Sequence, residues 1–177
     1  MNNFAVIERL EEFTFEKVKY YSIRFHENED EANEFYDFLT RMEDISEITS
    51  DLDNLLLWIE EIGKHHGAKK ERFFRHEAKG GEASALPPSS RIMELYEIVV
   101  EEKLRLYCMV ANENVVFLFN GGIKTTRYPQ DCPNVGPYFK QANNLTKKID
   151  KLFQEKSIRW NDDFTDINFD SSLIIEL

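Results

Sequence analysis

The segment from Ile92 to Thr126 constrains the fold most, because it contains three apolar runs separated by two short polar turns at 101–103 and 111–114. The runs are rich in Val, Ile, Tyr and Phe, which suit a half-buried pleated surface. In the middle run, apolar positions alternate with a second set at the period of a strand: Leu104, Leu106, Cys108 and Val110 against Arg105, Tyr107 and Met109. The pattern predicts a three-strand antiparallel meander that leaves through a flexible Gly121-Gly122 into a basic exit.

Arg105 is the charged side chain in the middle of this predicted sheet. A charge at such a position needs water, an ionic partner or an anionic ligand, because desolvating an unpaired charge is costly. The sequence leaves two interpretations open. Arg105 forms a structural ion pair with Glu94, Glu97 or a carboxylate on a helix, or it binds an anionic ligand.

The remaining elements follow from periodicity. Residues 18–26 alternate as a strand does, and residues 3–16 fit either a short helix or a first strand. Apolar positions at helical spacing predict helices near 29–43, 50–63 and 137–155. We therefore expect an α+β fold, in which a twisted antiparallel sheet has its helices packed mainly on one face.

Length and composition indicate a single domain. The chain has 177 residues, of which 42% are hydrophobic, so it can bury a sizeable core. No apolar run reaches membrane-spanning length, and the first residues lack a secretion-signal pattern. The expected location is the cytoplasm, with no membrane partner.

Charge is distributed unevenly along the chain. Residues 1–63 hold 17 Asp and Glu against 5 Lys and Arg, whereas residues 64–128 hold 11 Lys and Arg against 8 Asp and Glu. Since phosphate neutralisation drives nucleic-acid affinity, any such binding is confined to the middle segment. The candidate nucleic-acid-binding residues are Lys69, Lys70, Arg72, Arg75 and Lys79. The histidines are not spaced as metal ligands and no phosphate-loop motif occurs, so we expect neither metal nor cofactor.

Three local strings resemble the RelE/ParE/HigB toxins of bacterial type II toxin–antitoxin systems. Residues 103–107 (KLRLY) resemble the central strand of the family, and residues 115–124 (VVFLFNGGIK) resemble its last strand and lysine-bearing exit. Residues 125–133 followed by a helix resemble its C-terminal segment. In organisation the likeness covers a core of about 18–158, which leaves an N-terminal extension at 1–17 and an acidic C-terminal extension at 159–177.

This resemblance implies a metal-independent endoribonuclease that acts on mRNA at the ribosome and has a protein antitoxin as partner. It implies that Arg105 holds the scissile phosphate, that Lys124 or Arg127 stabilises the developing charge, and that Tyr128 acts as a base or a stacking platform. The alternative is a non-catalytic member of the same fold, a protein- or nucleic-acid-binding module. In this chain the predicted first meander strand carries Glu94 and Glu97 and no basic residue, and the chain is longer and more acidic than typical members.

The acidic C-terminal piece, 158–177, ends in an apolar stretch. We expect residues 172–177 to add to a sheet edge, and the aspartates before them to neutralise part of the basic segment at 64–128. The alternative is an acidic terminus that frays into solvent.

Overall fold

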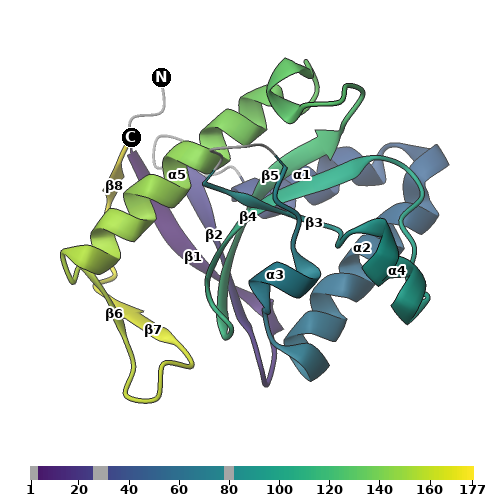
Figure 1. Cartoon of the computed structure of the whole chain (residues 1–177). Helices are drawn as coiled ribbons and strands as arrows, with labels where there is room; N and C mark the ends of the chain where they lie inside the picture. Colours follow the sequence, from purple (N-terminus) through teal and green to yellow (C-terminus); the bar gives the residue numbers. More distant parts are fainter. Residues whose placement is uncertain (1–3, 26–31, 78–81) are drawn as a thin grey trace.

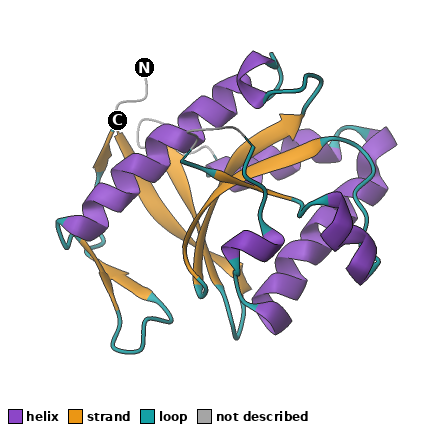
Figure 2. Cartoon of the chain, viewed as in Figure 1, coloured by secondary structure: helices purple, strands orange, loops and turns teal. Residues whose placement is uncertain are grey.

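A computed structural model describes residues 4–25, 32–77 and 82–177, and it contains a six-stranded sheet and a two-stranded sheet (Figures 1 and 2). The strand order of the large sheet is β3-β4-β5-β2-β1-β8. Its strands are β1 (Phe4–Thr14), β2 (Lys19–Phe25), β3 (Ser84–Leu86), β4 (Leu104–Asn112), β5 (Val115–Ile123) and β8 (Ile175–Glu176). The small sheet pairs β6 (Ile158–Trp160) with β7 (Ile167–Phe169). The α+β class is therefore confirmed.

The helices lie on both faces of the large sheet (Figure 1). They are α1 (Glu34–Glu43), α2 (Thr49–Glu61), α3 (Lys70–Phe73), α4 (Ser90–Tyr96) and α5 (Gly136–Gln154). Short 3₁₀ turns occupy Ser46–Ile48 and Pro129–Asp131, and a π-helical turn, Ile62–His66, continues α2. Among the described residues, no helix is both long and apolar enough to cross a bilayer.

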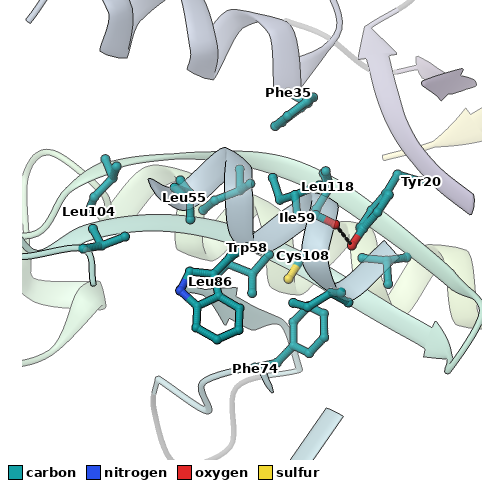
Figure 3. Packing of buried hydrophobic residues seen from close by; sticks show 14 of the residues in the cluster. Tyr20, Phe35, Leu55, Trp58, Ile59, Phe74, Leu86, Leu104, Cys108 and Leu118 are labelled. Atoms are coloured by element: carbon teal, nitrogen blue, oxygen red, sulfur yellow. Dashed lines mark hydrogen bonds between the residues drawn. The ribbon is translucent and has the colours of Figure 1, made fainter. Parts of the chain in front are cut away.

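The first core lies between the sheet and α1 to α4 (Figure 3). Trp58 and Phe35 are completely buried there, against Leu104, Leu106 and Cys108 of β4. The hydroxyl of Tyr20 also lies in this apolar layer, where it donates a hydrogen bond to the Ile59 carbonyl at 2.9 Å. The apolar positions that predicted a helix over 50–63, among them Leu52, Leu55 and Ile59, are the positions at which α2 is buried in this core.

The second core lies on the other face, beneath α5. Phe139, Ala142 and Leu145 of α5 pack onto Tyr107 and Phe117 of the sheet. The prediction that helices pack mainly on one face is wrong for α5, the longest helix. The physical reason is that β4 and β5 are apolar on both faces, so each face needs a cover.

The sheet is mixed, which corrects the predicted antiparallel arrangement. β2 and β5 run parallel, with Lys19 opposite Val115 and Tyr21 opposite Phe117. Parallel neighbours need a long crossover, and the whole segment from α1 to β4 provides it. The described part of 3–16 forms strand β1, which settles the alternative between helix and strand.

The three-strand meander predicted at 92–126 is wrong in its first strand. β4 and β5 form the expected hairpin, but residues 90–96 form α4, and the third strand is β3. Ile92, Met93 and Tyr96 face the first core at helical spacing, and the chain leaves the helix at Glu97 in a left-handed conformation. The following segment binds α2 instead of a strand, because Trp58 Nε1 donates to the Ile98 carbonyl at 2.8 Å.

The C-terminal segment adds to the edge of the sheet, as predicted. Ala5 of β1 pairs with Ile175 of β8, and Ile175 is buried. Its acidic part does not meet the basic segment in the way we expected. Asp166 binds Arg9 and Tyr21 on β1 and β2, whereas the 64–128 segment supplies β3, β4 and β5.

Candidate functional site

Strand β4 places Arg105 and Tyr107 on the α5 face of the sheet. Because side chains alternate along a strand, residues 105 and 107 share this face while Leu104, Leu106 and Cys108 enter the first core. The backbone of Arg105 lies opposite Gly122 of β5. The two strand ends that meet here carry Arg105 and, one residue beyond β5, Lys124.

The glycines of β5 permit a close approach to β4. They are buried strand residues, not a flexible exit, which corrects the sequence-based interpretation. A Cβ on Gly121 would lie 1.9 Å from the backbone oxygen of Arg105. The pairing register shifts at this point, between Leu106 and Cys108, as expected where a bulge brings two backbones together. A side chain at 121 would therefore displace Arg105.

The other side of this bulge is held by α1. Asn120 is 1% exposed, and its carboxamide donates to Glu34 and to Asp37, each at 2.8 Å. Arg41 of α1 donates to the Gly121 carbonyl at 2.8 Å. These contacts fix the end of β5, from which Lys124 extends.

Glu77 joins Arg105 to Lys124. Nε of Arg105 donates to Oε1 of Glu77, and Nζ of Lys124 donates to Oε2 at 2.9 Å. The side chains of Arg105, Glu77 and Lys124 are only 8%, 4% and 9% exposed. Burial alone would raise the pKa of the Glu77 carboxyl, but the two cations outweigh it and the net shift is downward. Glu77 is therefore held as a carboxylate.

Arg75 brings Glu77 to this position. The backbone of Arg75 pairs with Ala85 of β3 through hydrogen bonds of 2.8 and 3.0 Å, and its Nε donates to the Pro87 carbonyl at 2.9 Å. Burial and the charge of Arg105 lower the pKa of Arg75, and the Glu77 carboxylate opposes them. Three cations thus surround one carboxylate, so the cluster has an excess of positive charge.

Tyr107 adds a neutral donor to the cluster. Its ring packs against Phe139 of α5 with centroids 5.3 Å apart, and the residue is completely buried. Its hydroxyl has no hydrogen-bond partner among the described residues. Burial raises the pKa of the phenol, and the nearby Glu77 carboxylate raises it further. The hydroxyl therefore stays protonated, and within the described part of the chain it is a donor without an acceptor.

Cys132 lies just before α5 and contacts Thr125, the residue that follows Lys124. The backbone N–H of Thr125 donates to Sγ at 3.3 Å, and the Thr125 hydroxyl lies at the same distance. Burial opposes ionisation of the thiol, but these and further backbone hydrogen bonds lower its pKa to about 7. Cys108, in contrast, is a buried residue of the first core, as the sequence indicated.

The other predicted site residues lie elsewhere. Arg127 and Tyr128 are exposed in the loop after β5 and stack on each other at 5.3 Å. Lys69, Lys70 and Arg72 border a hollow with residues 110–113, at the far end of β4. Five residue steps along β4 separate that end from Arg105, a distance of about 16 Å. Of the predicted nucleic-acid-binding set, the structure brings Arg75 to the cluster, and Lys79 lies outside the described residues.

Sequence reasoning missed Glu77, Tyr107 and Cys132. Tyr107 could have been found, because the alternation that selects Arg105 puts residue 107 on the same face. Glu77 carried a weaker signal, as an acidic residue within a basic run. The expected partners of Arg105, Glu94 and Glu97, lie on and just after α4, and Glu77 takes their place.

The cluster has the chemical properties of a site for an oxygen anion. Arg105 and Lys124 already bind the two oxygens of one carboxylate, and guanidinium and ammonium groups bind phosphate in the same way. In the described part of the chain, no three His, Cys, Asp or Glu side chains come together as metal ligands. Comparison of the chain with protein-family models, with curated proteins and with solved structures found no match.

Proposed function

We propose that this chain is a metal-independent endoribonuclease of the RelE/HigB toxin type, which cleaves mRNA at the Glu77–Arg105–Lys124 cluster. One observation carries the proposal: Arg105 and Lys124, from two different strand ends, bind the same carboxylate. Two cations that share one carboxylate are also placed to share one phosphate. The resemblance of residues 103–107 and 115–124 to the family supports the same assignment.

The chemistry requires charge stabilisation and proton transfer. Attack of an RNA 2′-hydroxyl on the adjacent phosphate builds negative charge on the phosphoryl oxygens, releases a proton from the attacking oxygen and delivers one to the leaving oxygen. Arg105, Lys124 and Arg75 supply the positive charge. Glu77 is a carboxylate beside these cations and is the candidate proton acceptor, and water is the candidate donor of the proton that the leaving oxygen takes up. Exposed Arg127 and Tyr128 are candidates for contacts with flanking nucleotides.

A second candidate function is a binding module with the same fold and no catalysis. The observation that favours it is the closed state of the cluster, in which Arg105 and Lys124 are less than a tenth exposed and are both bound to Glu77. For catalysis, the phosphate must compete with Glu77 for Arg105 and Lys124. The two candidates therefore differ in whether RNA is cleaved.

The test is induced expression in a bacterial host, followed by growth curves and mRNA integrity. The proposed function predicts growth arrest with cleaved mRNA. Arg105→Ala should lower the cleavage rate at least about 100-fold, which is the usual loss when a group that stabilises the charge of a transition state is removed. The matched control is Arg9→Ala, which removes a different, partly exposed arginine bound to a carboxylate on the same face of the sheet and should retain cleavage.

Folding is checked for each purified variant by circular dichroism. Intact mRNA in cells that accumulate folded wild-type protein would contradict the endoribonuclease and favour the binding module. If both arginine variants lose cleavage equally while folded, Arg105 has no special role. A toxin also requires a neutralising partner, and we propose that an antitoxin with an acidic segment covers the exposed loop that carries Arg127 and Tyr128.

A further inference from the structure

The hydroxyl of Tyr107 is an energetic anomaly. A buried polar group without a hydrogen bond destabilises a fold by about 1–3 kcal/mol, so native proteins contain few of them. The corresponding buried phenol on the other face, Tyr20, donates to a carbonyl. Tyr107 keeps its hydroxyl with no acceptor among the described residues, beside an ion cluster.

The cluster has more donors than acceptors. Arg105 and Lys124 each give one hydrogen bond to Glu77, although a guanidinium carries five N–H groups and an ammonium three. Nη1 of Arg105 gives one more to the Leu104 carbonyl. Glu77 is the shared acceptor, and its carboxylate is planar, so it presents only two oxygens to the donors. A tetrahedral oxyanion in the same place offers additional oxygens in other directions.

We propose that a phosphate group takes the place of the Glu77 carboxylate and that the Tyr107 hydroxyl donates the third hydrogen bond to it, beside Arg105 and Lys124. Glu77 is then an internal substitute for the phosphate, which satisfies the two cations until the ligand binds. This inference deepens the proposed function by naming a substrate-binding residue. It also holds for free phosphate, without any cleavage.

The phenol is suited to this role because it remains protonated. Burial and the Glu77 carboxylate both raise its pKa, so at neutral pH it donates and does not repel an anion. The neighbouring Arg75 adds positive charge, while its Nε donates to the Pro87 carbonyl. Ring packing against Phe139 holds the phenol in place.

The experiment measures inorganic phosphate binding by isothermal titration calorimetry at constant ionic strength. Glu77→Ala removes the internal competitor and should bind phosphate at least about tenfold more tightly than wild type. Adding Tyr107→Phe to Glu77→Ala should weaken phosphate binding about tenfold or more, because one hydrogen bond to a charged group contributes about that much to affinity. Adding Tyr21→Phe instead is the matched control and should leave binding unchanged.

Equal phosphate affinity of Glu77→Ala with and without Tyr107→Phe would overturn the role of Tyr107. Absence of phosphate binding by folded Glu77→Ala would overturn the site itself. If Glu77→Ala does not fold alone, the same pair of phenylalanine substitutions is made on Glu77→Gln. Thermal unfolding with and without phosphate then decides, because only the Tyr107→Phe protein should lose the phosphate-dependent rise in Tm.

A second experiment distinguishes an RNA phosphodiester from free inorganic phosphate as the ligand. A short RNA with 2′-O-methyl groups cannot be cleaved, and tighter binding of this RNA than of inorganic phosphate identifies a diester ligand. Binding of inorganic phosphate alone identifies the free ion and leaves the Tyr107 assignment intact. Tyr107-dependent binding together with intact mRNA in the expression test would reject the proposed endoribonuclease while supporting this site.

Discussion

Two Arg–carboxylate–Tyr clusters lie on the α5 face of the sheet, and they differ in how completely they are satisfied. In the first, Arg9 donates to Asp166 at 2.9 Å and to the Tyr21 hydroxyl at 3.1 Å, and Tyr21 donates to Asp166. In the second, Glu77 binds Arg105 and Lys124, and the Tyr107 hydroxyl has no partner among the described residues. The same three residue types therefore form one closed cluster and one open cluster.

Burial makes this difference informative. The side chains of Arg9 and Asp166 are 32% and 22% exposed, so water shares in their solvation. Arg105 and Glu77 are 8% and 4% exposed, where an unsatisfied group is more costly. If both clusters were purely structural, the more deeply buried one should have more of its polar groups hydrogen-bonded. The reverse is observed, and we infer that the Tyr107 cluster is kept for a ligand.

The largest expected effect is on stability. Glu77→Ala leaves two buried cations unpaired and should reduce the free energy of unfolding by about 3–5 kcal/mol. Asp166→Ala affects a more exposed, salt-screened cluster and should cost about 1–2 kcal/mol. Urea unfolding at pH 7 in phosphate-free buffer measures both. Equal losses would show that the two clusters are energetically equivalent.

The next effect is on RNA cleavage and rests on the proposed function. Lys124→Ala should lower cleavage about 10- to 100-fold, less than Arg105→Ala, because an ammonium is a point charge and a guanidinium binds in a fork. Single-turnover cleavage of a short RNA measures it, with Lys64→Ala on the exposed surface of the π-helical turn as control. A larger loss for Lys124→Ala than for Arg105→Ala would reverse the assigned order.

A smaller effect distinguishes the two tyrosines. Tyr21→Phe removes a hydrogen bond to the Asp166 carboxylate and should cost about 1–2 kcal/mol of stability. Tyr107→Phe removes a hydroxyl that has no hydrogen-bond partner within the described residues, and it should be neutral or slightly stabilising without phosphate. Thermal and urea unfolding of both variants measure this. A destabilised Tyr107→Phe protein would mean that its hydroxyl is satisfied in solution.

The smallest effect is the response to acid. Glu77 and Asp166 both have a carboxyl pKa below the ordinary values of 4.5 and 3.8. Each contributes stability that is present above its unfolded-state pKa and is lost as the pH falls through the lower folded-state value. The stability difference between wild type and Glu77→Gln should therefore narrow below about pH 4.5. The difference for Asp166→Asn should persist to lower pH, and the opposite order in urea unfolding from pH 7 to 3.5 would contradict this assignment.

Local patterns in the sequence determined most of the elements. The period of two predicted β2 and β4, and the period of 3.6 predicted α1, α2 and α5 to within a few residues over the described positions. These predictions succeed because burial of one face is a property of a short segment. The same logic selected Arg105, because a charge inside an apolar strand needs an explanation whatever the fold.

Only the tertiary structure decided what the elements meet. The run at 92–100 suits a helix as well as a strand, and the place of Trp58 on α2 selected the helix and its loop. The parallel pairing of β2 with β5 joins segments more than 90 residues apart, which no local period encodes. Glu77 meets Arg105 because Arg75 pairs with β3, so the partner of the predicted arginine comes from another element. Sequence periodicity reports which face of an element is buried, whereas the chemistry at a site depends on contacts between elements distant along the chain.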